Sequence, residues 1–180
     1  MSKAGLPGEL SHEENIARMI RVNHAGEYGA KRIYAGQLAV LKNKPSAPII
    51  KHMAEQEEEH LRVFSDMLVE RRVRPTVLAP IWHVGGWLMG AATAMMGEKA
   101  AMACTAAVES VIDEHYAAQE VSLGGDEKIL KDTIAKFRAD EKEHHDTAIE
   151  QGAEQSPFYG VLTDVVKAQT RFAIWLSTRI

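Results

Sequence analysis

The stretches EEEH at residues 57–60 and EKEH at residues 141–144 are the most informative in this chain, because both are Glu-x-x-His motifs in strongly helical surroundings. On an α-helix, a spacing of three residues rotates the side chains by about 300°, so Glu and His lie on one face and can reach one metal ion. Alone, the motif is a weak signal, because eighteen Glu and eight His in 180 residues give about one match by chance. We interpret a third match, Glu9 with His12, as that chance event.

The first two motifs occupy equivalent places in an internal repeat. Glu57 and His60 recur 84 residues later as Glu141 and His144. The residues upstream of them recur 82 residues later: Glu27, Tyr34, Ala35 and Gln37 as Glu109, Tyr116, Ala117 and Gln119. A slightly longer loop in the second half accounts for the difference of two residues. The repeat therefore predicts two similar helical hairpins.

Each hairpin offers one lone glutamate and one Glu-x-x-His pair, which together are the ligands of ferritin-like di-iron bundles. Four carboxylates balance two Fe²⁺ ions, and oxygen ligands with two imidazoles suit iron or manganese. For each motif alone, a solvated acidic helix face is the competing interpretation. Glu109 favours the metal site, because it lies in a largely apolar run where an unpaired buried carboxylate costs several kcal/mol. The predicted metal ligands are Glu27, Glu57, His60, Glu109, Glu141 and His144.

The periodicity of the whole chain is helical, which predicts an all-α, ferritin-like four-helix bundle with a C-terminal helix added. Ser11 with Glu14 forms a capping box for the first helix, which we expect to end before Pro48. Ser156 and Pro157 are expected to cap and open the last helix. The expected helices span about 11–41, 49–72, 126–151 and 157–180, with a third long helix that ends at Gly124-Gly125. Residues 11–180 are expected to form one domain behind a flexible leader at 1–10.

The composition of the chain argues against several classes of function. A net charge of −4 without a basic run or an aromatic RNA-binding motif argues against nucleic acid as a partner. Cys104 is the single cysteine, so the chain has no intramolecular disulfide and no Cys-based metal site, and a reducing compartment is expected. The N-terminal residues lack the apolar run of a secretory signal.

Residues 75–97 carry no formal charge and include Trp82 and Trp87. The segment is almost long enough to span a bilayer, but it is rich in Gly and Ala and leads directly into the helix of Glu109. We therefore expect insertion at the membrane interface, joined by Phe172 and Trp175 of the C-terminal helix. The competing interpretation is that both segments cover the bundle core or form a dimer interface.

Three blocks carry a family resemblance: RVNHAGEYGAKRIYAG at 21–36, ACTAAVE at 103–109 and EKEHHD at 141–146. They closely resemble the demethoxyubiquinone hydroxylases of ubiquinone biosynthesis, and the resemblance runs from about Glu14 to the C-terminus. It implies a membrane-associated di-iron monooxygenase that uses O₂ to hydroxylate a demethoxyquinol ring, with all six ligand positions matched. His115 and Tyr116 match positions near the bound quinone, and Tyr34 is a further candidate for substrate contact.

The resemblance also implies two iron ions per chain, a prenylated quinol substrate and attachment to membrane lipid. The site would lie on the cytoplasmic side of a bacterial inner membrane, or on the matrix side of the mitochondrial inner membrane. We expect Glu57 and Glu141 to bridge the irons, with Glu27 and Glu109 as terminal ligands. The chain has no Gly-x-Gly-x-x-Gly signature and no Cys cluster, so electrons must come from an external reductant such as NADH.

The sequence is also compatible with other functions. A ferritin-like iron-storage or ferroxidase protein would use the same six ligands, a manganese catalase is a minor alternative, and a metal-free helical membrane adaptor would need none of them. The sequence does not decide between a monomer and a homo-oligomer, nor whether a lipid-presenting accessory protein is required.

Overall fold

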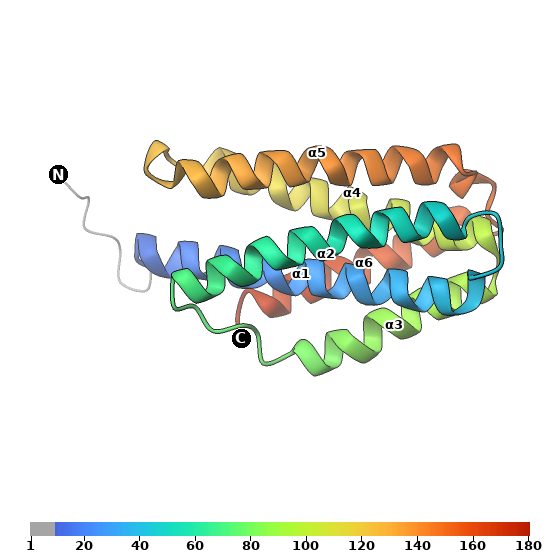
Figure 1. Cartoon of the computed structure of the whole chain (residues 1–180), viewed down its shortest axis with the longest axis horizontal. Helices are drawn as coiled ribbons and strands as arrows, with labels where there is room; N and C mark the ends of the chain where they lie inside the picture. Colours follow the sequence, from blue (N-terminus) through green and yellow to red (C-terminus); the bar gives the residue numbers. More distant parts are fainter. Residues whose placement is uncertain (1–9) are drawn as a thin grey trace.

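A computed structural model describes residues 10–180 and contains only helices and their connections in that range (Figure 1). The expected leader at 1–10 therefore lies, except for Leu10, outside the described residues. The helices are α1 (His12–Leu41), α2 (Ala47–Glu70), α3 (Ala79–Met95), α4 (Glu98–Ser122), α5 (Lys128–Glu150) and α6 (Tyr159–Ser177), with short 3₁₀ turns η1 (Gly125–Glu127) and η2 (Ala153–Gln155). The all-α prediction is confirmed.

The bundle consists of two hairpins, α1 with α2 and α4 with α5, which pack on each other through their apolar faces. Short loops between the paired helices force them to run antiparallel (Figure 1). The expected capping box of α1 is present, since the Ser11 hydroxyl accepts from the Glu14 amide and the Glu14 carboxylate accepts from the Ser11 amide. At the end of α5, Gly152 takes the left-handed conformation that stops the helix.

Two helix starts differ from the sequence-based expectation. Helix α2 already begins at Ala47, because Pro48 lies in its first turn, where a missing N–H leaves no bond unmade. Helix α6 begins at Tyr159, so the expected start at Ser156-Pro157 is wrong. The Ser156 hydroxyl bonds the Pro157 carbonyl instead of capping a helix, and Phe158 turns the chain with a φ of 58°.

The apolar core has two parts, one toward each end of the bundle. One surrounds Phe64 and Phe137, and the other surrounds Met53 and Met102. On α2 and α5, the Glu-x-x-His pairs lie between residues of one cluster and residues of the other, whereas residues of both clusters precede Glu109 on α4. The fold therefore encloses a polar layer between two apolar ones.

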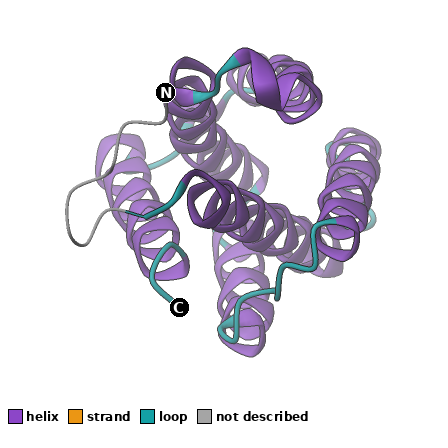
Figure 2. Cartoon of the chain, turned by 90° about the vertical axis from the view of Figure 1, so that its left-hand side faces the viewer, coloured by secondary structure: helices purple, strands orange, loops and turns teal. Residues whose placement is uncertain are grey.

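Helices α3 and α6 lie outside the two hairpins, α3 along α1 and α6 along α4 (Figures 1 and 2). Glycines allow α3 to approach α1 very closely. A Cβ added at Gly90 would lie 1.9 Å from the Ile33 carbonyl oxygen, and one at Gly36 would lie 2.1 Å from the Trp87 carbonyl oxygen. Backbone-to-backbone contact of this kind fixes α3 relative to α1, the helix that carries Glu27.

We expect Gly90→Ala to lower the free energy of unfolding by about 1–3 kcal/mol, because the new methyl group must push two backbones apart. Gly85→Ala is the matched control on the same helix. A Cβ at Gly85 meets nothing within 4 Å, so this change should stabilise α3 by roughly 0.5–1 kcal/mol through helix propensity. Urea unfolding followed by circular dichroism measures both. Equal effects of the two substitutions would contradict the close packing.

Candidate metal centre

Each hairpin contributes one lone glutamate and one Glu-x-x-His pair to the polar layer. The first helix of each hairpin supplies the lone glutamate: α1 supplies Glu27 and α4 supplies Glu109. The second helices, α2 and α5, supply the pairs. All six predicted side chains come together, and none is more than 2% exposed: Glu27, Glu57, His60, Glu109, Glu141 and His144.

The six side chains form two overlapping groups. Glu27 and His60 belong to one group, Glu109 and His144 to the other, and Glu57 and Glu141 belong to both. Within each group, one potential ligand atom per residue lies within 4.8 Å of the others. Two cation positions that share two carboxylates match this arrangement, in which the shared residues are the ones expected to bridge.

The hydrogen bonding of the cluster tests whether it suits metal ions. Eight buried atoms make no hydrogen bond: both carboxylate oxygens of Glu57 and of Glu141, one oxygen each of Glu27 and Glu109, and Nδ1 of His60 and of His144. Buried polar atoms in folded proteins are nearly always hydrogen-bonded, so eight such atoms on six neighbouring residues point to a common partner. The nearest contacts among them are His–Glu contacts of 3.3 Å, from His60 Nδ1 to Glu141 and from His144 Nδ1 to Glu57 and Glu141. Two divalent cations would satisfy these oxygen and nitrogen atoms together.

Both imidazoles are held with Nδ1 facing the cluster. His60 Nε2 lies 3.1 Å from an Asp140 carboxylate oxygen, and His144 Nε2 lies 3.0 Å from the Gln56 side-chain oxygen. Since both partners accept, each Nε2 carries a proton, and each Nδ1 is the atom that would bind a metal after release of any proton on it. Sequence reasoning missed Asp140 and Gln56, although both directly precede a ligand glutamate.

The two tyrosines of the repeat link the hairpins. Tyr34 of α1 donates to Glu109 of α4 at 2.7 Å, and Tyr116 of α4 donates to Glu27 of α1. Burial raises the pKa of both hydroxyls well above the ordinary value, so both remain donors. Each bond occupies one oxygen of a lone glutamate and leaves the other free.

Without cations, not all four carboxyl groups of the cluster can be ionised at once. Burial, and then the charge of Glu141, raises the pKa of Glu57 and of Glu109 well above the ordinary value. Burial opposes ionisation of Glu141 too, but contact with His144 and His60 outweighs it and lowers that pKa to about 2. Burial disfavours protonated His60, yet contact with Glu141 and Glu27 raises its pKa to about 10. Metal binding would therefore release protons.

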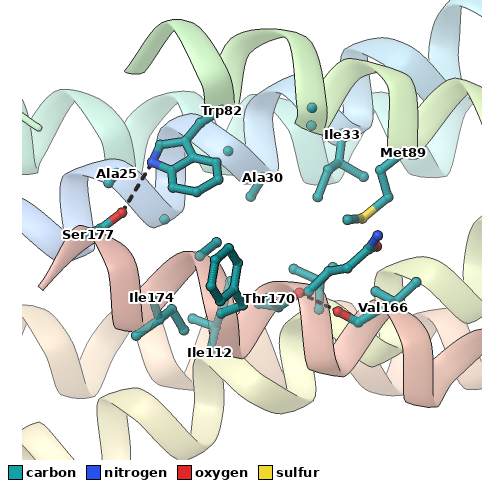
Figure 3. Close-up of a pocket in the computed structure, with 18 of the residues that line it drawn as sticks. Ala25, Ala30, Ile33, Trp82, Met89, Ile112, Val166, Thr170, Ile174 and Ser177 are labelled. Atoms are coloured by element: carbon teal, nitrogen blue, oxygen red, sulfur yellow. Dashed lines mark hydrogen bonds between the residues drawn. The ribbon is translucent and has the colours of Figure 1, made fainter. Parts of the chain in front are cut away.

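A cavity of about 610 Å³ opens on one side of the cluster, bounded by α1, α3, α4 and α6 (Figure 3). Its lining is mainly aliphatic, and Glu27, His115 and Tyr116 are among its few polar residues. Tyr34, the further candidate for substrate contact, does not line it, and neither do the metal-ligand candidates other than Glu27. Trp82 of α3 donates to Ser177 of α6 at 3.1 Å, a bond that spans the cavity (Figure 3). The sequence could not show this cavity, because four separated helices build its walls.

His115 faces this cavity within a polar network. Its Nε2 lies 2.7 Å from Gln119 Nε2 and 3.2 Å from Asn23 Oδ1, while Gln119 and Asn23 exchange two hydrogen bonds of 2.8 Å. The closer contact is with the Gln119 amide group, which donates, so His115 accepts at Nε2. Burial lowers the pKa of His115 to about 4, which keeps the ring neutral.

The aromatic residues expected at a membrane differ in exposure. Trp87, Phe172 and Trp175 are exposed, whereas Trp82 is half-buried in the cavity wall. Within residues 10–180, no helix combines the length and the apolarity needed to cross a bilayer. His12, from the chance motif, pairs with Asp126 at 3.2 Å, and its partner Glu9 lies outside the described residues.

A helical bundle with two lone glutamates and two Glu-x-x-His pairs turned inward is of the ferritin-like class. More narrowly, the chain belongs to the family described as ubiquinone biosynthesis protein COQ7, which matches residues 14–177. The membership of this family that the sequence resemblance predicted is thus confirmed.

Similar proteins include the 3-demethoxyubiquinol 3-hydroxylase of Rhodospirillum rubrum, 50% identical over 97% of this chain and 83% of that protein. The mitochondrial NADPH-dependent 3-demethoxyubiquinone 3-hydroxylase of Homo sapiens is 48% identical over 92% of this chain and 78% of the human protein. The mitochondrial 5-demethoxyubiquinone hydroxylase of Saccharomyces cerevisiae is 43% identical over 92% and 78%.

After removal of metal with a chelator, we expect the protein to lose stability as the pH rises from about 5 to about 8. Glu57 and Glu109 have raised folded pKa values, so their contribution is complete below the ordinary value of 4.5 and declines above it. His60 acts in the same direction above 6.5. Glu141 loses its contribution only below 4.5. Each proton held only by the folded chain gives a slope of roughly 1.4 kcal/mol per pH unit.

Thermal unfolding of the metal-free protein at several pH values measures this dependence. Glu57→Gln should flatten it by about one proton, because the amide does not titrate. A metal-free protein whose stability rises across this range would contradict the charge crowding in the cluster.

Proposed function

We propose that this protein is a di-iron monooxygenase that hydroxylates the ring of a demethoxyquinol in ubiquinone biosynthesis. The main support is that Glu27 belongs both to the cluster of potential metal-ligand atoms and to the wall of a large apolar cavity. A volume of about 610 Å³ lies within the range of ligand pockets and suits a quinol ring with the start of a prenyl chain. The names of the similar proteins describe the same reaction.

In this proposal Glu57 and Glu141 would hold both irons, Glu27 with His60 would complete one position, and Glu109 with His144 would complete the other. The grouping of the ligand atoms supports that division. When bound, the iron pair supplies the activation of O₂ that no amino-acid side chain can perform.

The remaining residues hold the ligands and shape the reaction space. Tyr34 and Tyr116 fix the lone glutamates from the opposite hairpin. The aliphatic cavity wall excludes bulk water from the side on which the ring would enter. His115, which is neutral and anchored by Gln119, lines the cavity and would offer its ring as a hydrogen-bond partner to an oxygen of the quinol. This assignment agrees with the substrate contact that the family resemblance implies.

Electrons must reach the cluster from outside the chain. Among the six buried ligand residues none is a redox carrier, and the sequence lacks a dinucleotide-binding signature. The human relative is named NADPH-dependent. We therefore assign the external reductant to the nicotinamide nucleotides, acting directly or through a reductase.

We further propose that the α3–α6 side of the molecule lies on a membrane surface. Large apolar side chains from both helices are exposed beside the cavity, including Leu88, Trp87, Phe172 and Trp175. A prenylated quinol would then pass from lipid to the cavity without crossing water. Several relatives carry the word mitochondrial in their names, which supports an inner-membrane location in eukaryotes.

Flotation with phospholipid vesicles tests the membrane proposal. We expect the wild type to float with the vesicles and the double variant Trp87→Ser/Phe172→Ser to remain below, with unchanged helix content. Wild-type protein that stays below and sediments as a dimer would instead assign this face to a second copy of the chain.

The hydroxylase proposal is tested with iron-loaded protein, a short-tailed demethoxyubiquinol, O₂ and a nicotinamide reductant. Mass spectrometry should detect product that carries one added oxygen atom, labelled when ¹⁸O₂ is used. Iron oxidation without hydroxylated product, in particles of many subunits, would place the protein with the iron-storing members of the class.

A cavity variant connects this activity to the proposed binding site. Ala92 lines the cavity from α3, and Ala92→Phe should raise the KM for the quinol at least several-fold while iron content stays constant. Ala39→Phe is the matched control, because Ala39 is exposed on α1 away from the cavity. Similar KM values for the two variants would contradict quinol binding in this cavity.

A further inference from the structure

The two residues that hold the ligand histidines are related by the internal repeat, as the ligands are. Gln56 and Asp140 are 84 residues apart, the same separation as Glu57 and Glu141. Each directly precedes a shared glutamate, and each contacts the histidine of the opposite hairpin. Asp140 of α5 holds His60 of α2, and Gln56 of α2 holds His144 of α5.

This pair breaks the symmetry of the ligand set. All six potential ligands are identical in type between the repeats, but one supporting residue is a carboxylic acid and the other is an amide. The two contacts have nearly equal lengths, 3.1 Å and 3.0 Å, and both histidines are 2% exposed. Geometry and burial are thus matched, while the charge of the hydrogen-bond acceptor differs.

The aromatic contacts of the two histidine rings also favour a more firmly held His60. The Phe137 ring stacks on His60 with centroids 3.9 Å apart, whereas the aromatic neighbour of His144 is Tyr34, edge-on at 6.3 Å. His60 is therefore held from its outer nitrogen and from one face of the ring. A carboxylate that accepts from the outer N–H makes an imidazole more basic, and hence a stronger ligand, than a neutral amide does.

We propose that Asp140 and Gln56 are positioning residues that make the two metal positions unequal, so that the position with His60 and Glu27 binds its ion more tightly and fills first. The proposal rests on the metal site proposed above and goes beyond it, because the ligand set alone predicts two equivalent positions. The tighter position contains Glu27, the ligand that lines the cavity. Unequal affinity would keep the metal next to the substrate in place when the other position is partly filled.

Two isosteric exchanges separate charge from geometry. Asp140→Asn keeps an oxygen that accepts from His60 but removes the negative charge, and Gln56→Glu adds a charge at the other support. Chelator-stripped protein is titrated with Fe²⁺ under anaerobic conditions in a calorimeter. We expect two separate binding steps in the wild type. Asp140→Asn should weaken the tighter step about 10–100-fold and leave the other nearly unchanged, while Gln56→Glu should strengthen the weaker step.

Glu143→Gln controls for the loss of a negative charge on α5, because Glu143 is exposed and lies two residues beyond Glu141. It should leave both steps unchanged. Two equal steps in the wild type, or equal weakening of both steps by Asp140→Asn, would overturn the inequality while leaving the metal site intact. No binding of Fe²⁺ to the wild type would instead overturn the metal site itself. Gln56→Glu keeps the inference testable if Asp140→Asn folds poorly.

Discussion

Four carboxyl groups and two imidazoles share one dry layer at the centre of this bundle, and eight of their atoms have no hydrogen-bond partner. Apolar clusters above and below exclude water from that layer. Removing this much charge from water costs several kcal/mol per unpaired ion, which protons offset only in part. Cations that neutralise the layer would therefore stabilise the fold and provide the chemistry at once.

The pseudo-two-fold repeat explains how one short sequence pattern builds this layer. Each hairpin uses its own residues to support ligands of the other: Tyr34 bonds Glu109, and Tyr116 bonds Glu27. The same exchange occurs farther out, where Gln37 bonds Thr105, while Gln119 bonds Asn23, the residue that matches Thr105 in the repeat. Neither hairpin can complete its half of the site alone.

The two halves of the bundle differ in the helices that cover them and in their access to the cavity. Helix α3 covers α1 and helix α6 covers α4, and the cavity between them reaches the ligand set through Glu27 rather than through Glu109. His115 occupies the place where the first repeat has Ile33, and it adds a polar ring to a mainly aliphatic wall. The cavity thus reaches the candidate metal centre from the side of Glu27.

The sequence was sufficient for the helices and the six candidate ligands, because helical spacing is local and the repeat checks each position twice. It was insufficient for contacts between helices. Asp140 and Gln56 each resembled solvated residues in a charged run until the opposite hairpin was placed beside them. The start at Ser156 failed because the preceding 3₁₀ turn redirects the chain before a helix can begin. Whether the six residues bind iron stays a prediction.

The presence of a metal pair is tested by the iron content of protein that has been loaded anaerobically and then desalted. We expect about two irons per chain in the wild type, as in other bundles of this kind. Glu57→Ala should retain almost none, because Glu57 belongs to both groups of ligand atoms, whereas Glu27→Ala should retain about one. Wild-type protein without iron, or Glu57→Ala with both irons still bound, would contradict a metal pair bridged at the centre of the bundle.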